Sequence, residues 1–317
     1  MSSFLSSFLT VGQQVLILFI LIAIGVLANK AKLLTEESAK GLSNVVLYCV
    51  TPCILIKSFV DIPYSTENLK DLFLVLLIAF LMHGGMILLS KFLVHDSDDA
   101  RQRMLRFAVI FSNAGYMGLP LQEALLGDEG AFFCGAYIAA FNAVAWSYGA
   151  MLMSGDRKAV SPKKILLSPG ILGVAIGLVL FLLPARFENF ALPELIFAPI
   201  RHLAALNTPL PMLVVGFYLA DIDFKAVLHD LKAFFVILLR VVAVPLLTFG
   251  ILYVCGLRGN MLVSLVISAS TPIAAITTMF AAKYDRYPHL SGNIVSLSTL
   301  LSVITMPLIV GLAETVA

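Results

Sequence analysis

In the middle of a long apolar segment, residues 112–120 read Ser-Asn-Ala-Gly-Tyr-Met-Gly-Leu-Pro. Two glycines lower the helix propensity of this stretch, and Pro120 also lacks a backbone N–H group. We therefore expect a helix to be interrupted here. At membrane depth an interruption is tolerated only where it faces protein or a wet cavity, because an unpaired amide in lipid costs several kcal/mol. The motif therefore predicts a cavity inside a membrane protein.

The composition of the whole chain indicates that its solvent is a lipid bilayer. Of the 317 residues, 60% are hydrophobic and 13% are charged, whereas soluble domains have about 45–50% apolar and about 25% charged residues. Membrane lipid is therefore an expected partner. Nucleic acid is not, because the net charge is only +2 and no basic cluster occurs. The first apolar run continues to Ala28 without a preceding positive segment, which is typical of a spanning helix and not of a cleaved signal.

Ten transmembrane helices are predicted from apolar runs of about 20 residues, the length that crosses the hydrocarbon core. The predicted spans lie near residues 10–29, 39–60, 70–94, 104–127, 130–153, 166–184, 194–219, 230–255, 259–283 and 290–313. The fold class is therefore an all-α membrane protein.

The basic residues predict the orientation, because Lys and Arg in short loops are retained on the cytoplasmic side. If the N-terminus is outside, the inner side holds fifteen of them, Lys30, Lys32, Lys40, Lys91, Arg101, Arg103, Arg106, Arg157, Lys158, Lys163, Lys164, Lys225, Lys232, Lys283 and Arg286. The outer side holds five, Lys57, Lys70, Arg186, Arg201 and Arg258. An even number of spans then places both termini outside in a multi-pass protein of the cell inner (plasma) membrane.

One long polar joint divides the chain into two sets of five helices. We expect a first repeat at residues 1–153, a cytoplasmic joint at 154–165 and a second repeat at 166–317. An odd number of helices in each half requires the halves to be inverted relative to each other. Inverted repeats with interrupted helices at matching positions are typical of secondary transporters, whose substrate binds near the midplane between the halves.

Proline positions support the repeat. The pair Thr51-Pro52 recurs as Thr208-Pro209, at an offset of 209 − 52 = 157 residues. The same offset relates Gly115 to Pro272, and both lie in interrupted spans. In the second of these spans, Thr271 is expected to cap one helical segment and Pro272 to open the next. The two second half-helices would then direct their positive N-terminal ends toward one central point, which suits an anion.

Two residues that can carry positive charge lie within predicted spans. Arg240 must face the protein interior, because an arginine in contact with lipid at this depth costs at least about 3 kcal/mol. At the repeat offset of 157 residues, the position that corresponds to Arg240 in the first half is His83, since 240 − 157 = 83. One interpretation places a cationic group near an anion site; the other has Arg240 bonded to the carbonyls of the broken helices as scaffold. His83 is likewise either functional, in coupling or support, or a core histidine.

The candidate substrate-binding residues are the polar and small residues at the interruptions and on neighbouring spans, namely Asn113, Gly115, Ser112, Thr271, Ser270, Thr51, Arg240 and Asn142. The residues expected to break helices are Pro52, Pro120, Pro209 and Pro272. Thr51 and Thr208 could cap their helices locally or line the cavity, and Asn142 could reach the centre or bond only between helices.

Several function classes find no support in the sequence. No Asp or Glu lies in the middle of a predicted span, which disfavours cation exchange. No phosphate-binding loop and no catalytic motif occurs, so neither ATP-driven transport nor an enzyme is expected. The four cysteines have no metal-site or redox spacing, and we expect no metal and no cofactor. Coupling to Na⁺ or H⁺ stays open.

Three segments resemble the auxin efflux carrier family, which includes the plant PIN carriers and bacterial proteins known as malate or malonate permeases. They are Asn44–Phe59 with its Leu-Tyr-Cys-Val-Thr-Pro core, Phe111–Pro120 and Ser268–Pro272. The resemblance implies ten helices in two inverted repeats, crossing of helices four and nine at their breaks, and an elevator-type transport core that moves against a scaffold which often forms a homodimer. It also implies that Asn113 contacts a substrate carboxylate. Plant members have an acidic residue in the third helix where this chain offers His83.

The leading hypothesis is therefore a secondary active or facilitative carrier of a small organic anion, such as a dicarboxylate or an auxin-like acid. A sodium-coupled organic-anion symporter of the bile-acid-transporter type is an alternative, because unwound backbone can ligate sodium as well as an anion. A third possibility is a membrane sensor that binds a ligand without moving it.

Overall fold

The computed structural model describes residues 2–156, 163, 166–187, 190–220 and 224–317. The predicted joint at 154–165, with Arg157, Lys158 and Lys164, lies largely outside these residues. The helices before the joint are α1 (Ser2–Lys30), α2 (Glu36–Val45), α3 (Thr51–Val60), α4 (Thr66–Leu93), α5 (Asp99–Ile110), α6 (Leu119–Val144) and α7 (Ala150–Ser154). Those after it are α9 (Pro169–Leu182), α10 (Glu194–Ala204), α11 (Pro209–Leu219), α12 (Phe224–His229), α13 (Leu231–Leu238), α14 (Val244–Val254), α15 (Gly259–Ser270), α16 (Ile276–Lys283) and α17 (Pro288–Glu314).

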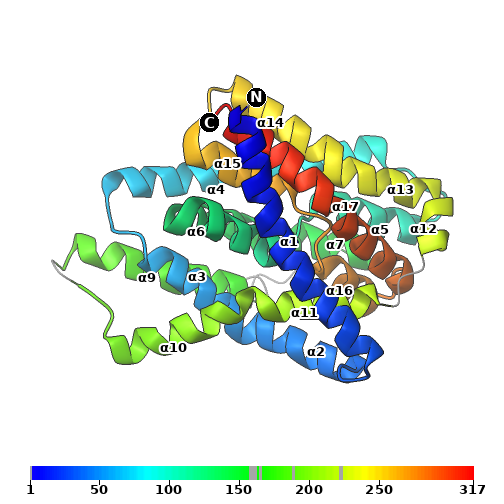
Figure 1. Cartoon of the computed structure of the whole chain (residues 1–317), viewed down its shortest axis with the longest axis horizontal. Coiled ribbons are helices and arrows are strands. Elements are labelled where there is room, and N and C mark those ends of the chain that lie inside the picture. The colour runs from blue at the N-terminus through cyan, green and yellow to red at the C-terminus, as the bar shows by residue number, and fades with distance from the viewer. Residues whose placement is uncertain (1, 157–162, 164–165, 188–189, 221–223) are drawn as a thin grey trace.

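The described residues confirm an all-helical membrane fold (Figure 1). Seven helical runs among them are long and apolar enough to cross a membrane, by length and composition, and Pro169–Ala185 and Gly259–Ser270 are shorter apolar helices. The run Ala114–Ser154 has 41 residues, which would measure about 60 Å as one straight helix, twice the hydrocarbon thickness. Gly127, at φ 64° and ψ −149°, breaks the helical path within this run. The count of ten spans remains a prediction.

The two faces of α4 show how such a helix meets lipid. Ala79, His83 and Met86 are buried, whereas Leu77 and Leu81 on other faces of the helix are 58% and 66% exposed. Large apolar side chains exposed to this extent in a soluble protein would promote aggregation, but facing lipid they cost nothing. The helix therefore presents one face to the protein and another to the bilayer.

Two glycines let α1 approach α11 closely. A Cβ on Gly216 would lie 2.1 Å from the Ile22 carbonyl oxygen, and a Cβ on Gly25 would lie 2.3 Å from the Leu213 carbonyl oxygen. Small residues at such contacts are the usual means by which transmembrane helices pack. Helix α1 also packs on α17, and Figure 1 shows the two ends of the chain close together.

The helix interruption expected at residues 112–120 is present and meets a second one. Helix α5 ends at Ile110, and helical structure resumes with a π-helical turn, Ala114–Gly118, that leads into α6. Between them, Asn113 N–H donates to the Pro272 carbonyl (2.9 Å), and Ala274 N–H donates to the Phe111 carbonyl (3.0 Å). These bonds form an antiparallel backbone pair, so the two interrupted segments cross in contact, as the resemblance implied.

Of the four prolines predicted to break helices, three lie in first turns of helices and one lies between two helices. Pro120, Pro52 and Pro209 lie in the first turns of α6, α3 and α11, where their missing N–H group is not needed. Pro272 does not open a helix, because α16 begins only at Ile276. The reason is the crossing, since Pro272 lies in the extended segment whose carbonyl accepts from Asn113.

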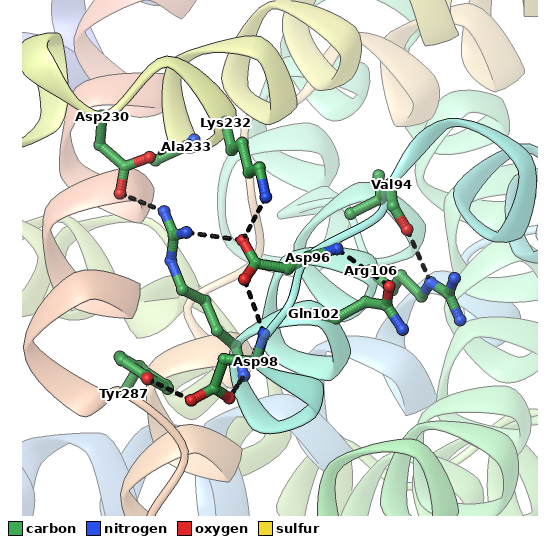
Figure 2. Close-up of polar contacts among 10 residues, drawn as sticks. Val94, Asp96, Asp98, Gln102, Arg106, Asp230, Lys232, Ala233 and Tyr287 are labelled. Atoms are coloured by element: carbon green, nitrogen blue, oxygen red, sulfur yellow. Dashed lines mark hydrogen bonds and ion pairs between the residues drawn. The ribbon is translucent and has the colours of Figure 1, made fainter.

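A network of ion pairs ties the α4–α5 loop to the start of α13 (Figure 2). Asp96 accepts from Arg101 Nη1 at 2.6 Å and from Lys232 Nζ at 3.2 Å. Arg101 also pairs with Asp230, which caps the first turn of α13 by accepting from the Ala233 N–H at 3.1 Å. The Asp96 side chain is only 3% exposed, so its charge depends on these partners.

Asp98 extends this network to the start of α17. Its carboxylate accepts from the Arg101 N–H at 2.9 Å, which caps α5, and from the Tyr287 hydroxyl at 2.7 Å (Figure 2). These hydrogen bonds hold the pKa of the Asp98 carboxyl below its usual range. Burial by itself raises the pKa of Asp96, but the Asp98 N–H and the charges of Lys232 and Arg101 outweigh it, so that this pKa is also lowered.

We expect Gly216→Ala to destabilise the protein by about 1–3 kcal/mol, because the added methyl group forces α1 and α11 apart. Gly12→Ala in α1, the partner helix of this contact, is the matched control, since a Cβ there meets nothing within 4 Å. It should be neutral or gain up to about 1 kcal/mol of helix propensity. Thermal unfolding of the purified variants measures both. Equal stability of the two variants would contradict the close approach.

We expect Asp96→Asn to lower the stability at neutral pH by about 1–3 kcal/mol, because a carboxylate held by charged hydrogen bonds is lost. A carboxyl whose pKa is lower in the folded than in the unfolded protein stabilises the fold at pH values above its unfolded pKa of about 4. This stabilisation disappears as the pH falls through the pKa of the folded state. The difference in Tm between wild type and variant should therefore shrink below about pH 4.

The matched control for Asp96 is Asp99→Asn. The Asp99 side chain is 69% exposed and pairs with Arg103. This exposed pair should contribute less than about 1 kcal/mol. A pH-independent difference for Asp96→Asn, or an equal loss in both variants, would argue against the proposed role of the network.

Candidate functional site

A small cavity lies against the crossing of the two interruptions. The space open to the centre of a water-sized group is about 70 Å³, where a single water needs about 10–15 Å³. A small organic ion therefore fits. The lining residues are Leu47, Thr51, Ser112, Asn113, Gly115, Tyr116, Ile138, Phe141, Asn142, Ala274, Ile276 and Met279. No Asp, Glu, Lys or Arg is among these lining residues.

Asn113 has the most specific position in this cavity. Its backbone N–H is fixed by the Pro272 carbonyl in the crossing, and its side chain is 4% exposed. The side-chain Nδ2 has no hydrogen-bond partner in the structure. A buried donor without an acceptor costs about 1–3 kcal/mol, so the Asn113 amide is poised to donate to a bound acceptor atom.

Two helical N-terminal ends also border the cavity. The helical run that begins at Ala114 contributes Gly115 and Tyr116 to the lining, and α16 contributes Ile276 and Met279. The first N–H groups of a helix have no acceptor within the helix, and they carry the positive end of its dipole. Two such ends at one cavity favour a negatively charged ligand.

The other predicted polar side chains in the lining each make a hydrogen bond within the protein. The Thr51 hydroxyl donates to the Val46 carbonyl at 2.9 Å, and Asn142 Nδ2 donates to the Ile138 carbonyl at 2.9 Å. The hydroxyl of Ser112 shares a 3.2 Å hydrogen bond with that of Tyr137. These side chains shape the cavity and can accept, whereas Asn113 brings a free donor.

Several predicted residues lie outside the cavity lining. The Ser270 hydroxyl donates to the Val266 carbonyl at 2.7 Å, and the Thr271 hydroxyl to the Ser268 carbonyl at 3.0 Å, so both bond back to carbonyls of α15. Thr208 lies at the start of α11, outside the lining, while its neighbour Asn207 donates from Nδ2 to the Gly115 carbonyl at 3.3 Å.

Arg240 is fully buried and also lies outside the lining. Its guanidinium donates to the carbonyls of Ala269 and Thr271, at the C-terminal end of α15, and to that of Val109 near the end of α5. Of the two interpretations from the sequence, these contacts match the one in which Arg240 bonds to the carbonyls of the broken helices.

His83 is packed among aromatic rings on the inner face of α4. Its Nδ1 lies 2.7 Å from the Ala79 carbonyl, which can only accept, so Nδ1 carries the proton. Its Nε2 has no partner. The ring centroid lies 5.2 Å from that of Tyr137 and 6.1 Å from that of Phe111. These contacts are those of a core histidine, and His83 does not reach the cavity.

A second, larger cavity of about 600 Å³ adjoins the first. Tyr116 and Met279 line both cavities, and they therefore form the wall between them. The larger cavity, here called the vestibule, also has Lys40 and His289 in its lining. It therefore extends toward the end of the molecule that carries the basic residues of the predicted inner side.

Tyr116 and Met279 could not be identified as wall residues from the sequence. Tyr116 lies in the interrupted motif, but nothing in that motif indicates on which side of the unwound backbone its ring lies. Met279 looks like any apolar helix residue. Only the crossing of two distant segments places both side chains at one constriction.

Comparisons with known proteins agree with a transport role. A family model described as "Membrane transport protein" matches residues 10–165 and 158–310. The chain is 26% identical over 302 residues to an uncharacterized transporter of Methanothermobacter thermautotrophicus, covering 93% of this chain and 96% of that protein. It is 23% identical over 302 residues to an uncharacterized transporter of Methanocaldococcus jannaschii, with the same coverage of 93% and 96%.

We expect Tyr116 to control access from the vestibule to the small cavity. A cysteine introduced as Ala274→Cys, in a chain whose Cys49, Cys53 and Cys255 are replaced by serine, reports this access through its reaction with a small water-soluble thiol reagent. Tyr116→Ala should accelerate the reaction about tenfold, because it removes the wall, whereas Tyr116→Phe keeps the ring and should change it little. Equal rates in all three backgrounds would show that Tyr116 is no barrier.

Proposed function

Because the chain belongs to the auxin efflux carrier family of membrane transport proteins, we propose that it is a secondary active or facilitative carrier of a small organic anion. The single observation that carries the proposal is the unpartnered Nδ2 of Asn113 in a buried cavity between two helical N-terminal ends. A carboxylate would accept from this amide and would be attracted by the positive ends of the two helices. The lining contains no acidic residue that would repel it.

The proposed architecture is ten spans in two inverted five-helix repeats, residues 1–153 and 166–317. Matching interruptions support it. A π-helical turn, Val46–Val50, precedes Pro52 in the second span, and a 3₁₀ turn, Ala205–Asn207, precedes Pro209 in the seventh. The crossing pairs the corresponding interruptions of the fourth and ninth spans through main-chain hydrogen bonds.

The transport cycle is proposed to be of the elevator type, in a homodimer in the cell inner (plasma) membrane with both termini outside. The vestibule supports a conformation open toward the inner side, where the basic residues gather. In α3, the Lys57 ammonium pairs with the carboxylate of Glu123 in α6 at 2.8 Å. This ion pair joins two segments that an elevator movement would separate.

Two alternatives differ in what they predict for vesicles. A sodium-coupled symporter of the bile-acid-transporter type would need a sodium gradient for uptake. A sensor would bind the anion with no uptake under any gradient. The matches to transporters favour a carrier over a sensor.

We expect Asn113→Ala to raise the apparent KM for organic-anion uptake into proteoliposomes about ten- to hundredfold, because a hydrogen bond to a charged ligand is lost. Asn113→Asp should abolish uptake, since it places a negative charge of nearly the same shape at the anion. Uptake is measured with a panel of radiolabelled monocarboxylates and dicarboxylates, at matched amounts of folded protein.

The control is Asn260→Ala, an exposed asparagine whose amide bonds to Glu129 far from the cavity. Its uptake should equal that of wild type. Unchanged kinetics in Asn113→Ala would remove the assignment of this cavity as the substrate site.

A further inference from the structure

The Arg240 guanidinium occupies a cluster of main-chain oxygen atoms. Nη2 lies 2.7 Å from the Ala269 carbonyl and 3.2 Å from that of Thr271, and Nε lies 3.3 Å from the Thr271 carbonyl. Nη1 lies 3.5 Å from the Val109 carbonyl and 3.4 Å from the Met86 sulfur. Among the residues that the structure describes, no carboxylate pairs with it, so its positive charge faces only dipoles.

These carbonyls belong to the negative ends of two helices. α5 ends at Ile110 and α15 ends at Ser270, so Val109 and Ala269 lie in last turns, whose carbonyls receive no N–H donor from their own helix. Two helix C-terminal ends therefore converge in the interior, at the same crossing whose N-terminal ends border the cavity. Without a cation, several partly negative oxygens would face one another with no water to screen them.

Carbonyls of unwound backbone and of half-helix C-terminal ends are the ligands with which secondary transporters coordinate sodium. Here a side chain from α13–α14 supplies the positive charge instead. A π-helical turn, Leu239–Ala243, adds a local bulge at Arg240, and such bulges commonly occur at functional positions. Thr271 accepts from Arg240, and the next residue, Pro272, accepts from Asn113. The guanidinium therefore binds the residue directly before Pro272, whose carbonyl holds the backbone of Asn113 and so positions its side-chain amide.

We propose that Arg240 is a tethered cation that takes the place of a coupling sodium ion at the crossing, so that anion transport by this chain does not require sodium. Arg240 is then a positioning residue, which acts on the substrate through Thr271, Pro272 and Asn113. The proposal rests on the proposed carrier function, and it assigns the carbonyl cluster, not the small cavity, as the cation site.

The first experiment compares wild type in sodium and potassium salts. Organic-anion uptake into proteoliposomes should be the same in both within about twofold. Uptake that requires a sodium gradient overturns the proposal while leaving the carrier function intact. No uptake in either salt contradicts the carrier function, and the binding experiment described next then tests the cation site alone.

Arg240→Ala leaves the carbonyl cluster empty. We expect its uptake to fall at least about tenfold in potassium salt and to be restored by free guanidinium, far below denaturing concentrations, or by sodium. The Tm of the purified variant should rise with either cation, as expected for a ligand that binds only the folded state, while the Tm of wild type should not. A folded Arg240→Ala that gains nothing from either cation overturns the proposal.

Arg258→Ala is the matched control, because Arg258 also donates to two main-chain carbonyls, those of Tyr253 and Leu257, at 2.7 Å each, but on the surface. Neither cation should change its uptake or its Tm. If Arg240→Ala does not fold, Arg240→Lys decides the matter, since it keeps the charge. This variant should transport without sodium, and a sodium requirement in Arg240→Lys overturns the proposal.

Discussion

The structure depends on one short antiparallel backbone pair, in which Asn113 donates to Pro272 and Ala274 donates to Phe111. Two interrupted helices at membrane depth leave main-chain polar groups that lipid cannot satisfy. Here each interruption satisfies the groups of the other. Since the pairing fixes residues 111–113 and 272–274 side by side, it also determines where four helical ends lie.

At the crossing, the positive N-terminal ends of the helices and their negative C-terminal ends face different sites. The two N-terminal ends border a small uncharged cavity, whereas carbonyls at the two C-terminal ends accept from the buried guanidinium of Arg240. The proposed anion in the cavity and the cation at the carbonyls are thus complementary consequences of the same backbone geometry. In the proposed function the helix ends supply the attraction for the anion, because the cavity lining has no charged residue.

The surroundings of the crossing combine a large cavity with contacts between helices that are distant in the sequence. The vestibule reaches the wall formed by Tyr116 and Met279 from the end that carries Lys40, and the network around Asp96 ties the α4–α5 loop to α13. Close packing through Gly25 and Gly216 holds α1 against α11. These contacts join helices that lie far apart in the sequence.

The sequence by itself determined that the chain is an all-helical membrane protein, that helices break near residues 112–120 and 268–272, and that Arg240 must face inward. These conclusions depend on local composition, on proline and glycine, and on the cost of charge in lipid, all of which can be read along one chain. The tertiary structure decided which residues share the cavity. It placed Asn113, Thr51 and Asn142 there and bonded Ser270 and Thr271 back to carbonyls of α15, and it left Pro272 extended because Asn113 binds its carbonyl. The direction of a side chain at an unwound residue depends on the partner strand, and that partner lies about 160 residues away in the sequence, where no local pattern can indicate it.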